Sequence, residues 1–354
     1  MKTRDLLRAI TACILFSSLI QANPAQAQIV NVPQAQSNLY ILDVSKSLFT
    51  QDLWFSLRDS IQEKLVQPFG NPKGKKQPAK PSVDISVSII SKASANSPLF
   101  NIVSRSDSDE IWKTLDNRIS GLNSVRIDEL NKALFDSGGV WAEQAEIFKQ
   151  EKVIAPSEIS CRSSMLKSMK NKTWIKNLNT EIQTELSVKL CKKLIDIATK
   201  YNKVDTFLTS PICEDTDRCS DVAGAILKST SYASDLLAKS KSTSKPELCI
   251  AIASDMLNDS VGITRKSSLD SEYHALNAKS EQDARSMGAN AARSVGVYFP
   301  KGVKTKVVMV GLGSGPNPIP LNRSSHLVAY WNGFFSAAGI IQSSQSQSIN
   351  RACA

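Results

Sequence analysis

The chain has 354 residues, of which 42% are hydrophobic and 21% charged, and its formal net charge is +10. This composition is typical of a globular protein and excludes a disordered polymer, a collagen-like fibre and a small disulfide knot. Only two histidines occur, His274 and His326, so a zinc site built from several histidines is excluded. The positive charge favours anionic partners without indicating nucleic acid, because the lysine-rich stretch 70–81 holds no aromatic side chain that could stack on bases.

Residues 1–27 have the pattern of a secretory signal peptide. A basic start precedes the apolar run 9–20, and a small-residue stretch ends at Ala27, where we expect cleavage. The apolar run is too short to cross a bilayer, and no later segment is long and apolar enough. We therefore expect an exported protein, periplasmic or secreted, with a short mature leader over 28–37 and no integral membrane segment after processing.

Cysteine usage agrees with an oxidising compartment. After cleavage an even number remains, and in an exported protein this predicts disulfide bonds whose pairing the spacing does not determine. The sequence lacks the paired C-x-x-C clusters of a zinc site. These cysteines are Cys161, Cys191, Cys213, Cys219, Cys249 and Cys353.

Strand and helix patterns alternate along most of the chain. Apolar strands that alternate with helices are typical of an α/β fold with a doubly wound, mostly parallel sheet and helices on both faces. Gly339 suits a helix C-terminal cap. The strand patterns cover 39–42, 83–89, 100–103, 248–253 and 306–310, and the helical patterns cover 47–65, 222–237, 284–295 and 322–338.

The stretch at about 105–212 differs, since its apolar residues keep helical spacing throughout. Leu186, Leu190 and Leu194, for example, form an i, i+4 stripe that we interpret as core packing, with an amphipathic membrane helix as the alternative. We expect a helical insertion into a domain spanning 38–340. The Gln/Ser-rich segment 341–354 is expected to be a flexible tail.

Oxygen-bearing side chains follow two predicted strands and open one helix. Asp43, Ser45 and Ser47 form a D-x-S-x-S run after the first strand, Ser220 opens the helix at 222, and Asp255 follows the strand 248–253. Ligands of such sheets collect at the carboxyl ends of the strands, and hydroxyl and carboxylate oxygens suit a hard divalent cation. The alternative is that the serines cap a helix and Asp255 lies in a turn.

This arrangement resembles the von Willebrand factor A domain family and its metal-ion-dependent adhesion site. The family pattern has D-x-S-x-S after the first strand, a threonine in a later loop, and an aspartate after a central strand. Ser220 stands where the family has threonine, with Thr216 as the other candidate, and Met256 replaces the usual glycine after the last aspartate. The resemblance covers about 38–105 and 213–340.

The resemblance implies a binding site and no catalytic residue. Its metal ligands would be Asp43, Ser45, Ser47, Ser220 and Asp255. They would hold a single Mg²⁺ or Mn²⁺ ion, with one coordination position open to a carboxylate from a protein or acidic polymer ligand. A bridge between Cys213 and Cys219 would stiffen the loop that offers Ser220, and we state this pairing as a hypothesis.

Other functional classes fit the sequence less well. The run 311–315 follows a strand, but it lacks G-x-G-x-x-G spacing and the prolines after it prevent a nucleotide-binding helix. A serine hydrolase would need a G-x-S-x-G elbow, and a phosphatase using Asp43 would need a carboxylate where Ser45 stands. We therefore expect a non-enzymatic binding protein. The alternative is a metal-free structural or assembly component of the cell envelope or a secretion apparatus, with a secreted hydrolase in third place.

Overall fold

The structure is a computed structural model that describes residues 36–43, 83–91, 93–104, 157–169, 178–209, 219–240, 245–257, 259–260, 271–314 and 319–353. All of them belong to the compact unit Pro33–Ala354. The predicted signal peptide, the start of the leader and the predicted helix at 47–65 lie outside the described residues, as do Ser45, Ser47, Cys213 and Thr216.

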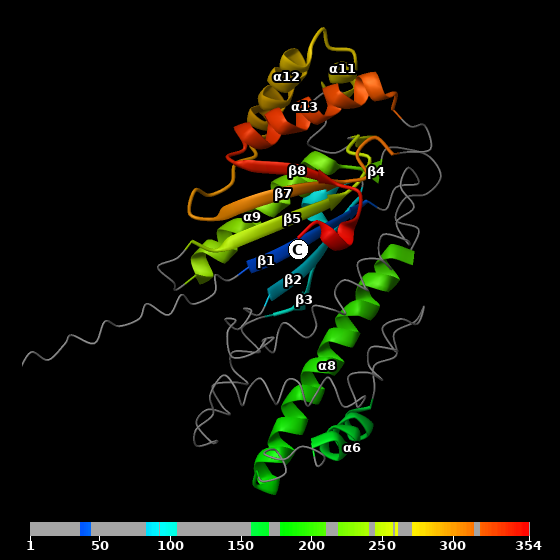
Figure 1. Ribbon diagram of the computed structural model, residues 1–354, viewed down its shortest axis with the longest axis vertical. Helices are drawn as coiled ribbons and strands as arrows, with labels where there is room; N and C mark the ends of the chain where they lie inside the picture. Colours follow the sequence, from blue (N-terminus) through cyan, green and yellow to red (C-terminus); the bar gives the residue numbers. More distant parts are fainter. Residues whose placement is uncertain are drawn as a thin grey trace, which may run out of the picture. The chain divides into compact units, whose positions relative to one another are not determined.

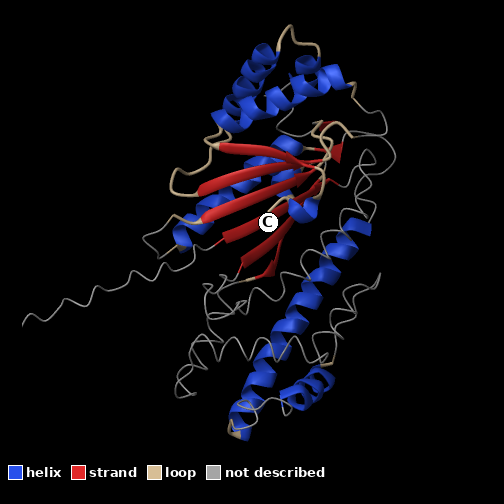
Figure 2. Ribbon diagram, in the orientation of Figure 1, coloured by secondary structure: helices blue, strands red, loops and turns tan. Residues whose placement is uncertain are grey.

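Six strands form one mostly parallel sheet in the order β3-β2-β1-β5-β7-β8 (Figures 1 and 2). Only the β2–β3 pair of this sheet is antiparallel. The predicted α/β class with a mostly parallel sheet is confirmed, and the strands predicted from apolar runs and alternation are present. Their bounds are β1 Gln36–Asp43, β2 Val83–Ile90, β3 Leu99–Val103, β5 Glu247–Ala253, β7 Lys304–Val310 and β8 Gln342–Ser346.

The strand order reverses direction at β1. From β1 the chain goes to β2 on one side, whereas β5, which follows the helical stretch, pairs with the other side of β1. In an open α/β sheet, a crevice for ligands forms outside the carboxyl ends of the two strands that flank such a reversal. Here those ends are Asp43 and Ala253.

Alternating side chains of the central strands are buried on both faces of the sheet. On one face, Leu39 and Ile250 share a core with Ile226 of helix α9 and Phe334 of helix α13. On the opposite face, Tyr40 is fully buried, and burial raises its pKa above the ordinary range. The helices on the first face are α9 Val222–Lys239, α11 Ser271–Leu276, α12 Glu281–Val295 and α13 Leu321–Ala337.

Two glycines allow α12 and α13 to pack closely. A Cβ on Gly288 would collide with the Tyr330 carbonyl oxygen, and a Cβ on Gly333 would collide with the Arg285 carbonyl oxygen. The backbones can approach this closely only without those side chains. Gly339 ends the turn after α13 with φ of 88°, as the predicted C-terminal cap requires.

β2 is buried on both faces, although its alternating sequence predicts a half-buried strand. Ser86 and Ser88 lie in the interior with the apolar residues. The Ser86 hydroxyl lies 3.1 Å from the Tyr232 hydroxyl of α9, so a hydrogen bond satisfies the polar group. Desolvation is the main cause that raises the pKa of Tyr232 from 10.0 to about 12.

The C-terminal segment is part of the fold, which corrects the expectation of a flexible tail over 341–354. β8 pairs in parallel with β7, and the short helix η3, Ile349–Arg351, follows it. A disulfide joins Cys353 to Cys249 of β5. Polar Gln and Ser side chains suit an edge strand, because backbone pairing needs no apolar residue there. Cys249 alternates with Ile250, so this link holds η3 on the face opposite α9 (Figure 1).

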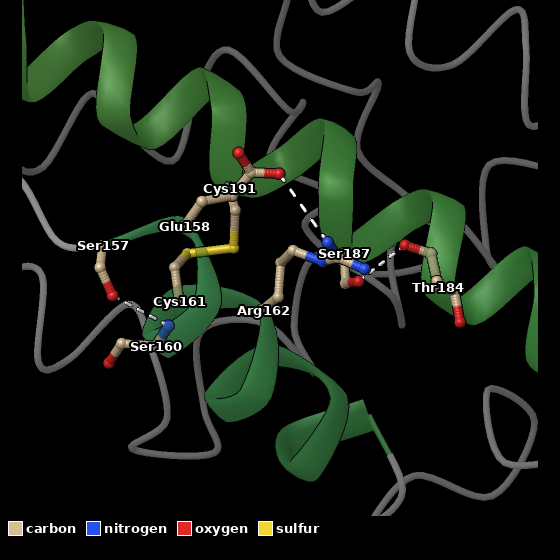
Figure 3. A network of polar contacts seen from close by, with 8 residues as sticks. All are labelled: Ser157, Glu158, Ser160, Cys161, Arg162, Thr184, Ser187 and Cys191. Atoms are coloured by element: carbon tan, nitrogen blue, oxygen red, sulfur yellow. Dashed lines mark hydrogen bonds and ion pairs between the residues drawn. A yellow bond between two sulfur atoms is a disulfide. The ribbon is translucent and has the colours of Figure 1, made fainter.

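The described part of the stretch 105–212 consists of two helices, α6 Glu158–Met169 and α8 Thr180–Thr209. A disulfide between Cys161 and Cys191 joins them (Figure 3). Within α6, Arg162 lies 3.9 Å from Glu158. The helical content that the apolar spacing predicts is present in these residues.

Candidate functional site

Asp43 lies at the end of β1 and is fully buried. The Ser220 hydroxyl donates to its carboxylate, 3.2 Å from both Oδ1 and Oδ2. The Ser254 hydroxyl donates to Oδ2 at 2.7 Å. Burying a carboxylate removes its hydration and lowers the stability of the fold by roughly several kcal/mol, unless hydrogen bonds or a cation compensate for the loss. Two segments that are distant in sequence therefore supply donors to this charge.

Ser254 belongs to the candidate site, although the sequence analysis did not include it among the metal ligands. It is fully buried directly after β5, and its Oγ accepts a hydrogen bond from the Met256 N–H at 2.9 Å. The Ser254 hydroxyl thus donates one hydrogen bond to the Asp43 carboxylate and accepts another from the backbone of the next turn. The signal was available, because a hydroxyl residue immediately precedes Asp255 at the end of an apolar strand.

Met256 adopts the backbone conformation that glycine favours. Its φ is 64°, and it is the only non-glycine residue with positive φ among the described residues. Its side chain is buried, and its carbonyl oxygen accepts a hydrogen bond from the Trp331 indole N–H at 2.9 Å. Methionine therefore keeps a left-handed turn at the position where the family that the sequence resembles has glycine, at a cost of about 1–2 kcal/mol of strain.

Asp255 begins the same turn and is 4% exposed. Its Oδ1 accepts the Leu257 N–H at 3.0 Å, and its backbone carbonyl accepts the Gly313 N–H at 3.0 Å. Gly311 and Gly313 both have positive φ, which lets the β7 exit turn reach this backbone. The glycine-rich run after β7 thus fixes the Asp255 turn.

The loop that carries Ser220 is held by Asp221. This carboxylate caps α9 by accepting the Gly224 N–H at 3.0 Å, and it accepts the Ser94 N–H at 2.9 Å. The Asp221 N–H donates to the Ser91 carbonyl oxygen after β2. A short antiparallel pair, β4 Cys219–Ser220 with β6 Asp259–Ser260, ties the Ser220 loop to the segment after Asp255. The loops after β2 and β5 therefore both position Ser220.

The donor set fits a hard cation. Oxygen atoms of Asp43, Ser220 and Asp255 are the ligand type that Mg²⁺ and Mn²⁺ prefer. Within the described ranges, no three His, Cys, Asp or Glu side chains form a metal cluster, so a metal at this edge depends on serine hydroxyls. Ser45 and Ser47, the other two predicted ligands, lie outside the described residues.

Comparison with known proteins leaves the family open. No protein-family model matches the sequence, and no curated protein matches it. One similar solved structure is the human COPII-coat protein Sec24c, with 8% sequence identity and a TM-score of 0.29. The similarity covers 89% of this chain and 29% of that protein's chain. A TM-score this low indicates neither a family nor a function. The described helices include none that is both long and apolar enough to cross a membrane.

Proposed function

We propose that this protein is an exported, non-enzymatic binding protein of the von Willebrand factor A type. It engages a protein or acidic polymer ligand through a divalent ion, Mg²⁺ or Mn²⁺, at the carboxyl edge of β1 and β5. The observation that supports this proposal is the fully buried Asp43 carboxylate, with serine hydroxyls from two other loops directed at it.

The position of this carboxylate favours a ligand site. Asp43 lies where the strand order reverses, which is the edge at which open α/β sheets bind ligands. Asp255, a second buried carboxylate, begins the adjacent turn. A cation bound at this edge would be attracted by both carboxylates, in addition to the hydrogen bonds that they already accept.

Asp43, Ser220 and Asp255 would hold the ion together with Ser45 and Ser47. The ion supplies a Lewis-acidic position that accepts a carboxylate oxygen from the ligand. Ser254 acts as a positioning residue, because it orients Asp43 and fixes the turn that offers Asp255. Asp221 does the same for Ser220 through the α9 cap.

The second candidate is a metal-free structural or assembly component. The hydrogen bonds from Ser220 and Ser254 favour it, because hydroxyl donors stabilise a buried carboxylate without an ion. Metal binding separates the two candidates.

The test is calorimetric titration of Mg²⁺ and Mn²⁺ into the metal-free protein, with Asp43→Asn as the variant and Asp84→Asn on β2 as the matched control. We expect one ion per chain in the wild type and in D84N, and at least about tenfold weaker binding in D43N, since the charge is the main attraction. If the folded wild type binds neither metal, the structural candidate replaces this proposal.

The ligand class has its own test. Polyglutamate is the probe, and we expect the immobilised protein to retain it in Mg²⁺ and to release it in EDTA. Equal retention in both buffers contradicts a metal-mediated contact.

A further inference from the structure

A basic pocket lies at the amino ends of the parallel strands, opposite the end where Asp43 lies. It has a volume of about 360 Å³ and forms where β5 and β7 begin, close to the start of β1 and β8. The pocket is separated from Asp43 by the length of β5, about 20 Å at the usual rise per residue. Among the described residues that line it are four lysines: Lys245, Lys301, Lys304 and Lys306.

The charge of this pocket is strongly one-sided. Glu247 is the one acidic residue among the described residues that line it, and its carboxylate lies 3.3 Å from the Lys304 ammonium. Lys306 is flanked in register by Cys249 of β5 and Gln342 of β8, which are both neutral. Four ammonium groups and one carboxylate therefore share one concave surface, and their mutual repulsion is reduced when an anion binds.

An apolar rim adjoins the amines. Ile341 lines the pocket and is 100% exposed. Tyr298, 54% exposed, lies beside Gly339, since a Cβ added to that glycine would be 3.8 Å from the tyrosine ring, and it precedes Lys301 by three residues. A fully exposed isoleucine next to a cationic pocket provides an apolar contact for a ligand that carries both charge and hydrocarbon.

We propose that this pocket is a second binding site, for phosphate groups, at the amino edge of the sheet. Lysine ammonium groups are point charges that bind phosphate oxygens well, and several of them suit a ligand with more than one negative charge. The phosphate has two possible sources, a soluble polyphosphate or the headgroup of an anionic phospholipid, and Ile341 would contact the acyl region only in the second. This second site is independent of the metal site, because no residue that lines the pocket forms a hydrogen bond to Asp43 in the described part of the chain.

The test uses Lys301→Gln/Lys306→Gln and a charge-matched control, Lys203→Gln/Lys279→Gln. The two control lysines are exposed residues on α8 and before α12. Tripolyphosphate is titrated by calorimetry, and vesicles of phosphatidylglycerol and phosphatidylcholine are tested by sedimentation. We expect K301Q/K306Q to weaken binding about tenfold and the control double variant to change it less than about twofold.

The two sources of phosphate give different results. Binding of tripolyphosphate alone identifies a soluble ligand, whereas vesicle binding that Ile341→Ser weakens identifies a headgroup, and both support the site. Hydrogen exchange of the wild type, with and without the bound probe, locates the contact without any variant. We expect protection at the start of β7 and at residues 339–342. Absence of binding to both probes, equal losses in the two double variants, or protection elsewhere overturns the proposal.

Discussion

The contact between Ser254 and Asp43 can be tested by Ser254→Ala. The substitution removes a hydrogen bond to a buried charge, which contributes about 1.5–3 kcal/mol, and leaves the Met256 N–H without its acceptor, at a further cost of about 1–3 kcal/mol. Relaxation of the turn recovers part of this, so we expect the free energy of unfolding to fall by about 3 kcal/mol. Urea unfolding followed by circular dichroism, in EDTA, measures it.

Ser229→Ala is the matched control. Ser229 is equally buried, but its hydroxyl donates only to the Ala225 carbonyl oxygen within α9. Its loss should change the free energy of unfolding by less than about 0.5 kcal/mol, since alanine also favours the helix. In an Asp43→Asn background, S254A should lower the free energy of unfolding by about half as much, because the charged acceptor of the Ser254 hydroxyl has been removed. Equal losses in S254A and S229A would refute the assigned role of Ser254.

Three further perturbations probe the turn, α9 and the C-terminal link. Met256→Gly should be more stable than Met256→Ala by about 1 kcal/mol in urea unfolding, because only glycine relaxes a φ of 64°; the reverse order contradicts that conformation. The pKa of Tyr232 is raised from 10.0 to about 12, so its neutral form stabilises the fold below pH 10. That contribution, about 3 kcal/mol, is lost as the pH rises from 10 to 12, and Tyr232→Phe should remove this part of the alkaline slope. Cys353→Ser opens a link that spans 104 residues and should lower the free energy of unfolding by about 2–5 kcal/mol; an unchanged midpoint in urea would show that the link does not form.

Apolar runs and apolar–polar alternation predict most strands of the sheet from the sequence. The run 248–253 is apolar throughout and 306–310 is apolar from Val307 onward, which is typical of strands buried on both faces of a parallel sheet, and they lie in β5 and β7. β8 could not be predicted in this way. Its residues, Gln342–Ser346, lack apolar alternation, and the pairing depends on β7 and on the Cys249–Cys353 bond.

The candidate site was predictable only in part. A D-x-S-x-S run and an aspartate after a strand make Asp43 and Asp255 candidates, because ligands of such sheets collect at the carboxyl ends of the strands. The role of Ser254 depends on register, since β1 and β5 must be neighbours before its hydroxyl can reach Asp43. Local sequence contains no information about that pairing across the chain.

The pairing of β1 with β5 also affects how the protein folds. Asp43 and Ser254 are 211 residues apart in sequence, so the central strand pair closes a very long loop, and such contacts form slowly. During synthesis, β1 is made long before its neighbour β5, and the two halves of the site meet only after everything between them has been made. A chain synthesised only as far as β5 therefore lacks the turn that carries Ser254 and Asp255, and a ligand that needs Asp43 and Asp255 together would select molecules in which β1 and β5 have already paired.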